Sequence, residues 1–244
     1  MNSPATSASP GPTSVAEGGL IRVYVWDVPV RLTHWLLAIS IAVLAVTGIY
    51  IGHPFITAPN PAGQEFVMGT ILAIHFFAAI VFSLSELARI VWMFMGNRYA
   101  RWNQLIPTSK DRWRRAWEWL KFYALFRPVT PRFVGHNPLA GLTYILVYAV
   151  CVLAALTGYA MFSVYAGVDS PMRVFSGLLP LFGGLQTARW IHHMCMWLIV
   201  LFVIHHISCA LLVARAAGNG TIDSMFSGFR FARQEDLAAE EAER

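Results

Sequence analysis

The sequence contains few charged residues. Asp, Glu, Lys and Arg make up 13% of its 244 residues, whereas 57% are hydrophobic. Soluble domains usually carry about 25% charged residues, so this chain has little of the surface that a soluble domain needs. This composition argues against a soluble enzyme and against a nucleic-acid-binding protein, even though the net charge is +5.

Cysteine is scarce as well. The chain has three cysteines, and all of them lie within apolar segments: Cys151, Cys195 and Cys209. They form neither the paired spacing of a zinc site nor the Cys-x-x-Cys-His sequence of covalently attached haem. We interpret them as small packing residues, and a secreted disulfide scaffold is excluded.

What the chain does have is long hydrophobic segments. A helix that crosses a bilayer takes about 20 apolar residues. Four segments free of Asp, Glu, Lys and Arg reach or approach this length: Leu32–Gly52, Phe66–Leu84, Leu139–Phe162 and Trp190–Ala214. We therefore expect an all-α fold, an integral membrane four-helix bundle with spans at about 32–52, 66–84, 139–162 and 190–214, within a domain of residues 21–231.

The segments outside the spans are short. Residues 1–20 are rich in Ser, Pro, Ala, Thr and Gly and are expected to be disordered. Residues 109–126 carry Trp113, Trp117 and Leu120 at helical spacing among basic residues, which predicts an amphipathic helix on the membrane surface or a helix that docks a partner. Residues 232–244 form an acidic tail that we expect to be a solvated helix.

The basic residues predict the orientation. With four spans, the N-terminus, the middle loop and the tail share one side of the membrane, and 16 of the 18 Lys and Arg residues lie there. Because cytoplasmic loops carry the excess of Lys and Arg, we expect both termini to be cytoplasmic, in the inner membrane.

The histidines are concentrated in the spans. Six of the eight lie there: His34, His75, His192, His193, His205 and His206. A single histidine in a span is more often a hydrogen-bonded packing residue. Six of them favour a cofactor, because ionisable side chains in hydrocarbon usually face a partner or a bound group.

Helical geometry selects among these histidines. The 14-residue step from His192 to His206 returns to the same helix face, about 21 Å further along the axis. His193 and His205 point elsewhere, and we expect them to make hydrogen bonds to neighbouring helices or to the propionates of a haem. Two sites therefore stack along one face, and the direction of each span pairs His34 with His206 near the cytoplasm and His75 with His192 near the periplasm.

The group held between two paired imidazoles is best explained as haem. Zinc prefers four protein ligands, whereas haem iron already has four porphyrin nitrogens and needs two axial ligands. Without covalent attachment sites the haem would be b-type. Gly48 lies on the face of His34 at the level of the periplasmic site, and its small size serves either the macrocycle or simple helix packing. The tripeptide Val46-Thr47-Gly48 in the first span is similar to Leu156-Thr157-Gly158 in the third span. This similarity is too short to indicate a repeat.

Several motifs resemble one family. Arg31-Leu32-Thr33-His34-Trp35 with Leu44-Ala45-Val46-Thr47-Gly48 resembles the first signature of the b-type cytochrome subunit of nickel–iron hydrogenases. His192-His193-Met194-x-x-Trp197 with Phe202 and His206 resembles the second signature. Met68-Gly69 before His75-Phe76, and Gly135-His136-Asn137-Pro138-Leu139-Ala140, are also similar to this family.

The resemblance implies four helices that hold two non-covalent haems b, with His34, His75, His192 and His206 as axial ligands. It also implies an electron-transfer subunit with no hydrogen-activating site of its own. The hydrogenase would lie on the periplasmic face, as a large subunit and an iron–sulfur small subunit whose C-terminal helix packs against the bundle. Electrons would pass through the chain to quinone as the acceptor.

Some alternatives stay open. His136 is a candidate quinone contact, although Gly135-His136-Asn137-Pro138 also suits the entry into a helix. The chain could instead be the cytochrome b subunit of another respiratory complex, such as formate dehydrogenase or thiosulfate reductase. A haem-free membrane anchor or metal transporter is the remaining alternative.

Overall fold

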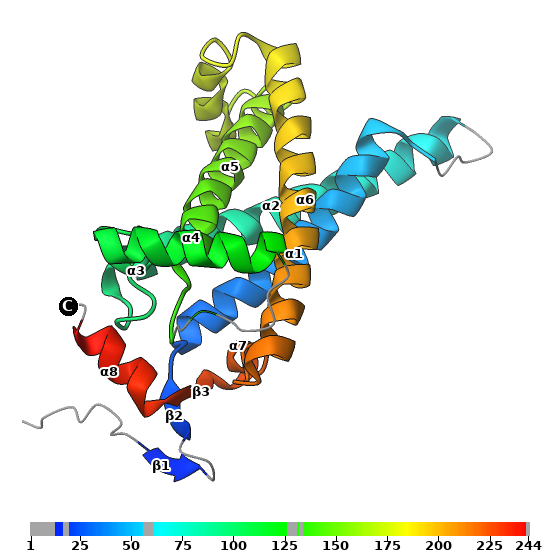
Figure 1. Ribbon diagram of the computed structural model, residues 1–244. Helices are drawn as coiled ribbons and strands as arrows, with labels where there is room; N and C mark the ends of the chain where they lie inside the picture. Colours follow the sequence, from blue (N-terminus) through cyan, green and yellow to red (C-terminus); the bar gives the residue numbers. More distant parts are fainter. Residues whose placement is uncertain (1–12, 17–19, 56–60, 126–130, 132–133, 243–244) are drawn as a thin grey trace, which may run out of the picture.

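The computed structural model describes residues 13–16, 20–55, 61–125, 131 and 134–242. Four of its helices are long and apolar enough to cross a membrane: α1 (Val28–Gly52), α2 (Pro61–Met95), α5 (Pro138–Ser163) and α6 (Leu185–Ala217). Figure 1 shows these helices with the shorter elements around them. The prediction of an all-α membrane bundle is confirmed.

The long helices pack as two pairs. Helix α1 lies along α2, and α5 lies along α6, with α2 also contacting α5. Within the described residues, α6 makes few close backbone contacts with α1 or α2. In Figure 1 the α1–α2 pair and the α5–α6 pair run in different directions. This arrangement leaves side chains, rather than backbones, to meet between α6 and the first pair.

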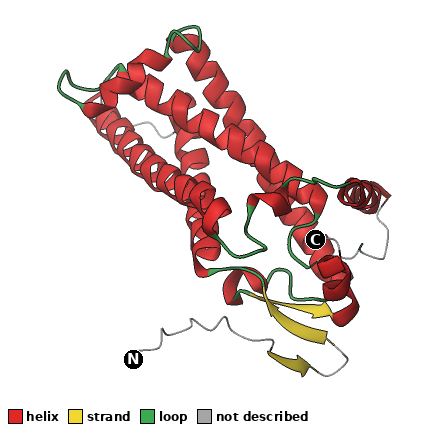
Figure 2. Cartoon of the chain, turned by 90° about the vertical axis from the view of Figure 1, so that its left-hand side faces the viewer, coloured by secondary structure: helices red, strands yellow, loops and turns green. Residues whose placement is uncertain are grey.

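A small sheet closes one end of the bundle. Strands β1 (Thr13–Ala16), β2 (Leu20–Tyr24) and β3 (Phe229–Arg233) are antiparallel in the order β1-β2-β3. Figure 2 shows the strands and the helices near them at one end of the molecule. We call this the sheet end, and the opposite end, where α1 and α5 finish and α6 begins, the far end.

The sheet corrects one expectation from the sequence. Residues 13–16 and 20 belong to the segment 1–20 that was expected to be disordered, yet they form strands. The rest of that segment lies outside the described residues. Strand β2 pairs with β3, so residues more than 200 positions apart stabilise each other, for example Tyr24 and Phe229. A local sequence pattern carries no signal of such a distant partner.

Helix α2 continues beyond the span that the sequence suggested. The uncharged run ends at Leu84, but the helix continues to Met95 through Glu86 and Arg89. These two charged side chains are 3% and 4% exposed, so they face protein rather than lipid. These two charged residues therefore do not end the helix, because the surrounding protein covers their side chains.

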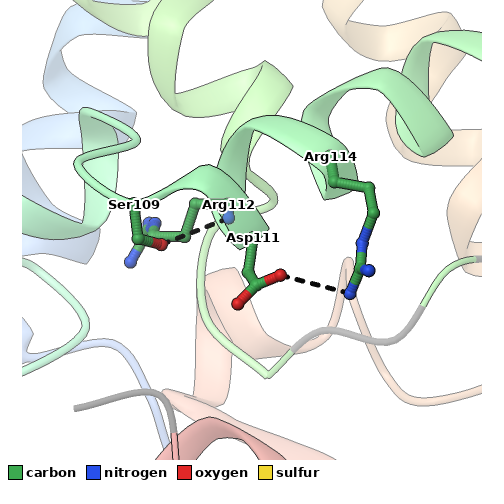
Figure 3. Close-up of polar contacts among 4 residues, drawn as sticks. All are labelled: Ser109, Asp111, Arg112 and Arg114. Carbon is green, nitrogen blue, oxygen red and sulfur yellow. Dashed lines mark hydrogen bonds and ion pairs between the residues drawn. The ribbon is translucent and has the colours of Figure 1, made fainter.

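The amphipathic segment forms α4 (Lys110–Leu125), which lies across α5 and α6 in Figure 1. Ser109 Oγ accepts a hydrogen bond from the backbone N–H of Arg112 at 3.3 Å, and Asp111 pairs with Arg114 at 3.3 Å (Figure 3). Ala116, Trp119 and Phe122 form the buried face of the helix. The residues that suggested the helix, Trp113, Trp117 and Leu120, are exposed on its surface.

The remaining elements are short. They are α3 (Trp102–Leu105), the 3-10 helix η1 (Pro171–Leu178) before α6, α7 (Ser224–Ser227), and α8 (Gln234–Ala242), which is formed by the acidic tail. Trp119 and Phe122 of α4 pack against Val213 of α6, which fixes the surface helix to the bundle.

Asp27 joins the start of α1 to the end of α2. Its carboxylate accepts hydrogen bonds from the Trp92 indole at 3.2 Å, the Asn97 backbone N–H at 2.9 Å and the Asn97 amide at 2.8 Å. Asn97 also donates to the carbonyl of Val25 at 3.0 Å. This network positions α1, and with it the first histidine of the sheet end.

We predict that Asp27→Ala lowers the free energy of unfolding by about 2 kcal/mol, because it leaves three donors without their acceptor. The unfolding midpoint of the detergent-purified protein measures this change. Asp27→Asn retains an acceptor oxygen and should lose less. An unfolding midpoint of Asp27→Ala equal to that of the unmodified protein would contradict the assigned role.

Candidate cofactor site

The structure brings the four span histidines selected from the sequence together as two facing pairs. His34 of α1 and His206 of α6 have ring centroids 6.3 Å apart, and we call them the sheet-end pair. His75 of α2 and His192 of α6 have ring centroids 6.4 Å apart, and we call them the far-end pair. Both pairs bridge α6 to the α1–α2 pair, where few backbones meet.

The spacing of both pairs fits a metal held between two imidazoles. A nitrogen–metal distance of roughly 2 Å on each side places the two ring centroids roughly 6 Å apart. Within the part of the chain that the structure describes, no three His, Cys, Asp or Glu side chains gather to hold a bare ion. Two ligands per metal match iron whose other four ligands come from a porphyrin.

Thr47 is the hydrogen-bond partner of His75. The Thr47 hydroxyl donates to the Val43 carbonyl at 2.7 Å, and Thr47 Oγ1 lies 2.8 Å from His75 Nδ1. A hydroxyl has one proton, and with that proton on the Val43 carbonyl the Oγ1 atom accepts from Nδ1–H of His75. This is the tautomer that leaves the lone pair of Nε2 available to a metal.

The same tautomer is required for His192. Its Nδ1 lies 2.9 Å from the Ala154 carbonyl and 3.2 Å from Thr157 Oγ1. A carbonyl accepts only, so Nδ1 carries the proton. The Thr157 hydroxyl, like that of Thr47, donates to a carbonyl of its own helix, here Leu153 at 2.7 Å.

Two glycines give the far-end pair its space. A Cβ atom at Gly48 would lie 3.5 Å from His75 Cε1, and one at Gly158 would lie 3.1 Å from His192 Cε1. The second distance is tighter than ordinary van der Waals contact. Gly48 and Gly158 thus let the imidazoles approach α1 and α5, which adds a third role to the two considered for Gly48.

The sheet-end pair has aromatic surroundings. Phe202 stacks on His206 with ring centroids 5.4 Å apart, and Tyr144 meets the same ring edge-on at 5.9 Å. Trp35 meets His34 edge-on at 5.1 Å. The Nδ1 atom of His34 is buried and has no hydrogen-bond partner among the described residues. The two pairs therefore differ in how Nδ1 is satisfied.

Two buried arginines lie at the sheet end of the bundle. Arg89 is 4% exposed and donates to the Ala100 carbonyl at 3.4 Å, and Arg230 donates to the carbonyls of Val134 and Gly135 at 3.0 and 3.1 Å. Burial lowers the pKa of Arg230 to about 10, so its guanidinium stays charged at neutral pH. These cations could pair with haem propionates, and the sequence analysis did not single them out.

His136 belongs to the entry of α5. Its Nδ1 donates to the Tyr99 carbonyl at 3.1 Å, and its ring packs edge-on against Trp26. Burial, with the guanidinium of Arg89 adding to it, lowers the pKa of His136 to about 3, so the ring is neutral at physiological pH. Asn137 caps α5 by accepting from the Ala140 N–H at 2.6 Å, which is the helix-entry role considered for this motif.

The other span histidines are bonded within their own helix. His193 Nδ1 donates to the Arg189 carbonyl at 2.9 Å, and His205 Nε2 lies 3.5 Å from Cys209 Sγ. Neither belongs to the facing pairs. Within the described residues, the hydrogen bonds of both rings run along α6 rather than to neighbouring helices.

Thr47 and Thr157 are the functional candidates that the sequence analysis missed. The sequence did contain an indication of them, because Thr47-Gly48 in the first span is repeated as Thr157-Gly158 in the third span. Its meaning required the rotation of each helix, which places threonine and glycine together against a histidine.

A four-helix membrane bundle with facing histidine pairs of this spacing is a membrane-bound cytochrome b. Residues 25–228 match the family described as prokaryotic cytochrome b561, and the chain belongs to that family. Haem b is accordingly its prosthetic group, and the chain is a multi-pass membrane protein that transfers electrons and is not itself a catalytic enzyme.

Curated relatives are similar to this chain over most of their length. A protein of Cupriavidus necator, described as a probable Ni/Fe-hydrogenase B-type cytochrome subunit, is 38% identical over 221 residues, which cover 89% of this chain and 91% of the relative. Its namesake in Azotobacter vinelandii is 36% identical over 211 residues, 85% of this chain and 88% of the relative. In Escherichia coli K12, a probable Ni/Fe-hydrogenase 1 B-type cytochrome subunit is 34% identical over 216 residues, 86% and 92% of the two chains.

We predict that His193→Ala keeps the full haem content, because the ring of His193 is bonded to its own helix and faces neither pair. The measurement is haem per polypeptide in the purified protein. Loss of haem from this variant would show that the wrong member of the His192-His193 pair has been assigned.

Proposed function

We propose that this chain is the membrane subunit of a nickel–iron hydrogenase, and that it holds two haems b and passes electrons from the hydrogenase to quinone. The observation that carries this proposal is the pair of bis-histidine sites. The 6.3 and 6.4 Å ring separations support an iron porphyrin in each, and the step from His192 to His206 sets the sites about 21 Å apart along α6. The named relatives support the hydrogenase as partner rather than formate dehydrogenase or thiosulfate reductase.

The distribution of basic residues supports an orientation. The sheet end has 16 of the 18 Lys and Arg residues on its side of the spans, so we assign it, and both termini, to the cytoplasm of an inner-membrane protein. The far end then faces the periplasm. Electrons enter at the far-end pair and leave at the sheet-end pair.

The far end supports a partner on the periplasmic side. Around η1, Val168, Val174 and Leu181 are 84%, 76% and 78% exposed. Large exposed apolar side chains beyond the helix ends are typical of a surface that another protein covers. We assign this surface to the hydrogenase small subunit, whose iron–sulfur clusters deliver the electrons, with its C-terminal helix against the bundle and the large subunit beyond.

When bound, haem b supplies a one-electron iron couple. The chain provides the rest. The four imidazoles would hold the two irons, the Nδ1 bonds orient His75 and His192, and the apolar helices exclude water. Arg89 and Arg230 offer positive charge to propionates at the sheet end.

We place quinone reduction at the sheet end. Buried ionisable side chains in a membrane helix usually mark a functional path, and Glu86, 3% exposed, has one carboxylate oxygen buried without a partner among the described residues. His136 is the other candidate contact, but its Nδ1 proton is bonded to the carbonyl of Tyr99. Glu86 therefore has more capacity to bind a quinone oxygen or carry a proton.

We predict that His206→Ala loses one haem and keeps the other, because only the sheet-end pair loses a ligand. Haem per polypeptide, measured after extraction, gives the answer. A variant that retains the full haem content would refute His206 as a ligand.

The function itself is tested with the complex purified through this chain. We expect hydrogenase subunits to co-purify and hydrogen to reduce a soluble quinone analogue. The rate should fall roughly tenfold or more in His206→Ala. In the matched control His193→Ala it should stay unchanged. Co-purification of a molybdenum enzyme, or an unchanged rate in His206→Ala, would contradict the proposal.

A further inference from the structure

We infer that Thr47 and Thr157 are matched positioning residues that hold the proton on Nδ1 of His75 and His192, and thereby keep the far-end haem at a lower reduction potential than the sheet-end haem. This inference rests on the proposed function, because it takes both histidine pairs as haem ligands. It goes further by assigning the direction of the potential step to particular hydroxyl groups.

The first step is the direction of each hydrogen bond. Both threonine hydroxyls donate back along their own helix at 2.7 Å, Thr47 to Val43 and Thr157 to Leu153. An iron on Nε2, as in the proposed function, places the proton of each histidine on Nδ1, so each oxygen accepts from the histidine that faces it, at 2.8 Å for His75 and 3.2 Å for His192. The hydroxyl is thus the acceptor in both contacts.

The second step is that the same device occurs twice. Thr47 lies on α1 and reaches His75 on the neighbouring α2, and Thr157 lies on α5 and reaches His192 on the neighbouring α6. In both cases the next residue is a glycine whose missing side chain leaves room for the same imidazole. Two packed helix pairs therefore present one histidine each to the far-end site in the same way.

The third step is the contrast with the sheet end. There, the buried Nδ1 of His34 has no acceptor among the described residues. A hydrogen bond from Nδ1–H makes the imidazole a stronger donor to the metal, and a stronger donor favours the oxidised iron. Two such bonds at the far end lower its potential, so an electron that enters there moves favourably to the sheet end.

The bonds also predict a ranking. Thr47 is the one acceptor that the described residues offer to His75 Nδ1, whereas His192 Nδ1 also has the Ala154 carbonyl at 2.9 Å. Removing the Thr47 hydroxyl leaves its histidine without an acceptor, whereas His192 keeps one when the Thr157 hydroxyl is removed. Thr47 should therefore have the larger effect.

The test is a redox titration of both haems in the purified full-length protein, followed by absorbance. Thr47→Val keeps the shape of the side chain and removes the hydroxyl, and it should raise the potential of one haem and leave the other unchanged. Thr157→Val should raise the same potential by less. Thr47→Ser restores the hydroxyl and should restore the potential.

Thr70→Val is the matched control, because Thr70 also donates to a carbonyl of its own helix, Phe66 at 2.9 Å, and has no described bond to a histidine. It should change neither potential. Repeating Thr47→Val in the His206→Ala background identifies the haem, since the one that remains should show the shift. The low-temperature spin-resonance signal of the same oxidised haem should also change, because its ligand ring is less constrained.

The outcomes are distinct. Unchanged potentials in Thr47→Val, equal shifts in Thr47→Val and Thr47→Ser, or a shift confined to the haem that His206→Ala removes would overturn the inference. Each of these leaves the proposed function intact. If the unmodified protein contains no haem, the proposed function fails first. Loss of one haem from Thr47→Val with recovery in Thr47→Ser supports the same role of the hydroxyl.

Discussion

The structure depends on which partners the two nitrogens of each imidazole have inside a membrane. Each ring has two nitrogens, and hydrocarbon offers a partner to neither. At the far-end pair, backbone and threonine oxygens lie within hydrogen-bond distance of Nδ1 of His75 and His192, and the proposed haem iron would take Nε2 of both rings between α2 and α6. The separation of α6 from α1 and α2 leaves the room that the proposed macrocycles would need between the rings.

The small elements serve this arrangement. The sheet ties the start of α1 to the chain that follows α6, and Asp27 ties the start of α1 to the end of α2. Because His34 lies six residues inside α1 and His206 lies on α6, these ties set the separation of the sheet-end pair. Helix α4 adds a second brace by packing Trp119 and Phe122 against α6. The two ends of the bundle are thus organised differently. Glycine and threonine residues surround the histidines of the far end, whereas aromatic rings and buried guanidinium groups lie at the sheet end.

Much of this could be predicted from the sequence, and the parts that could not share a physical reason. The spans and the grouping of four histidines follow from hydrophobic length and from 100° per residue, both local properties. Helix α1 begins at Val28, four residues before the first apolar segment, so His34 lies well inside the helix. Helix α2 exceeded its prediction because Glu86 and Arg89 are covered by protein, and the strands were missed because their partners are remote in sequence. Thr47 and Thr157 could be recognised in the sequence as parts of two similar tripeptides, but only the packed helices show that both face a histidine.

The central claim is that each histidine pair holds one iron porphyrin. The most direct measurement is the amount of extractable protohaem per polypeptide in the unmodified protein, together with the spin state of the oxidised iron. The account predicts two non-covalent protohaems per chain, both low-spin as expected for two imidazole ligands. A chain with a single haem, with none, or with a high-spin centre would contradict it.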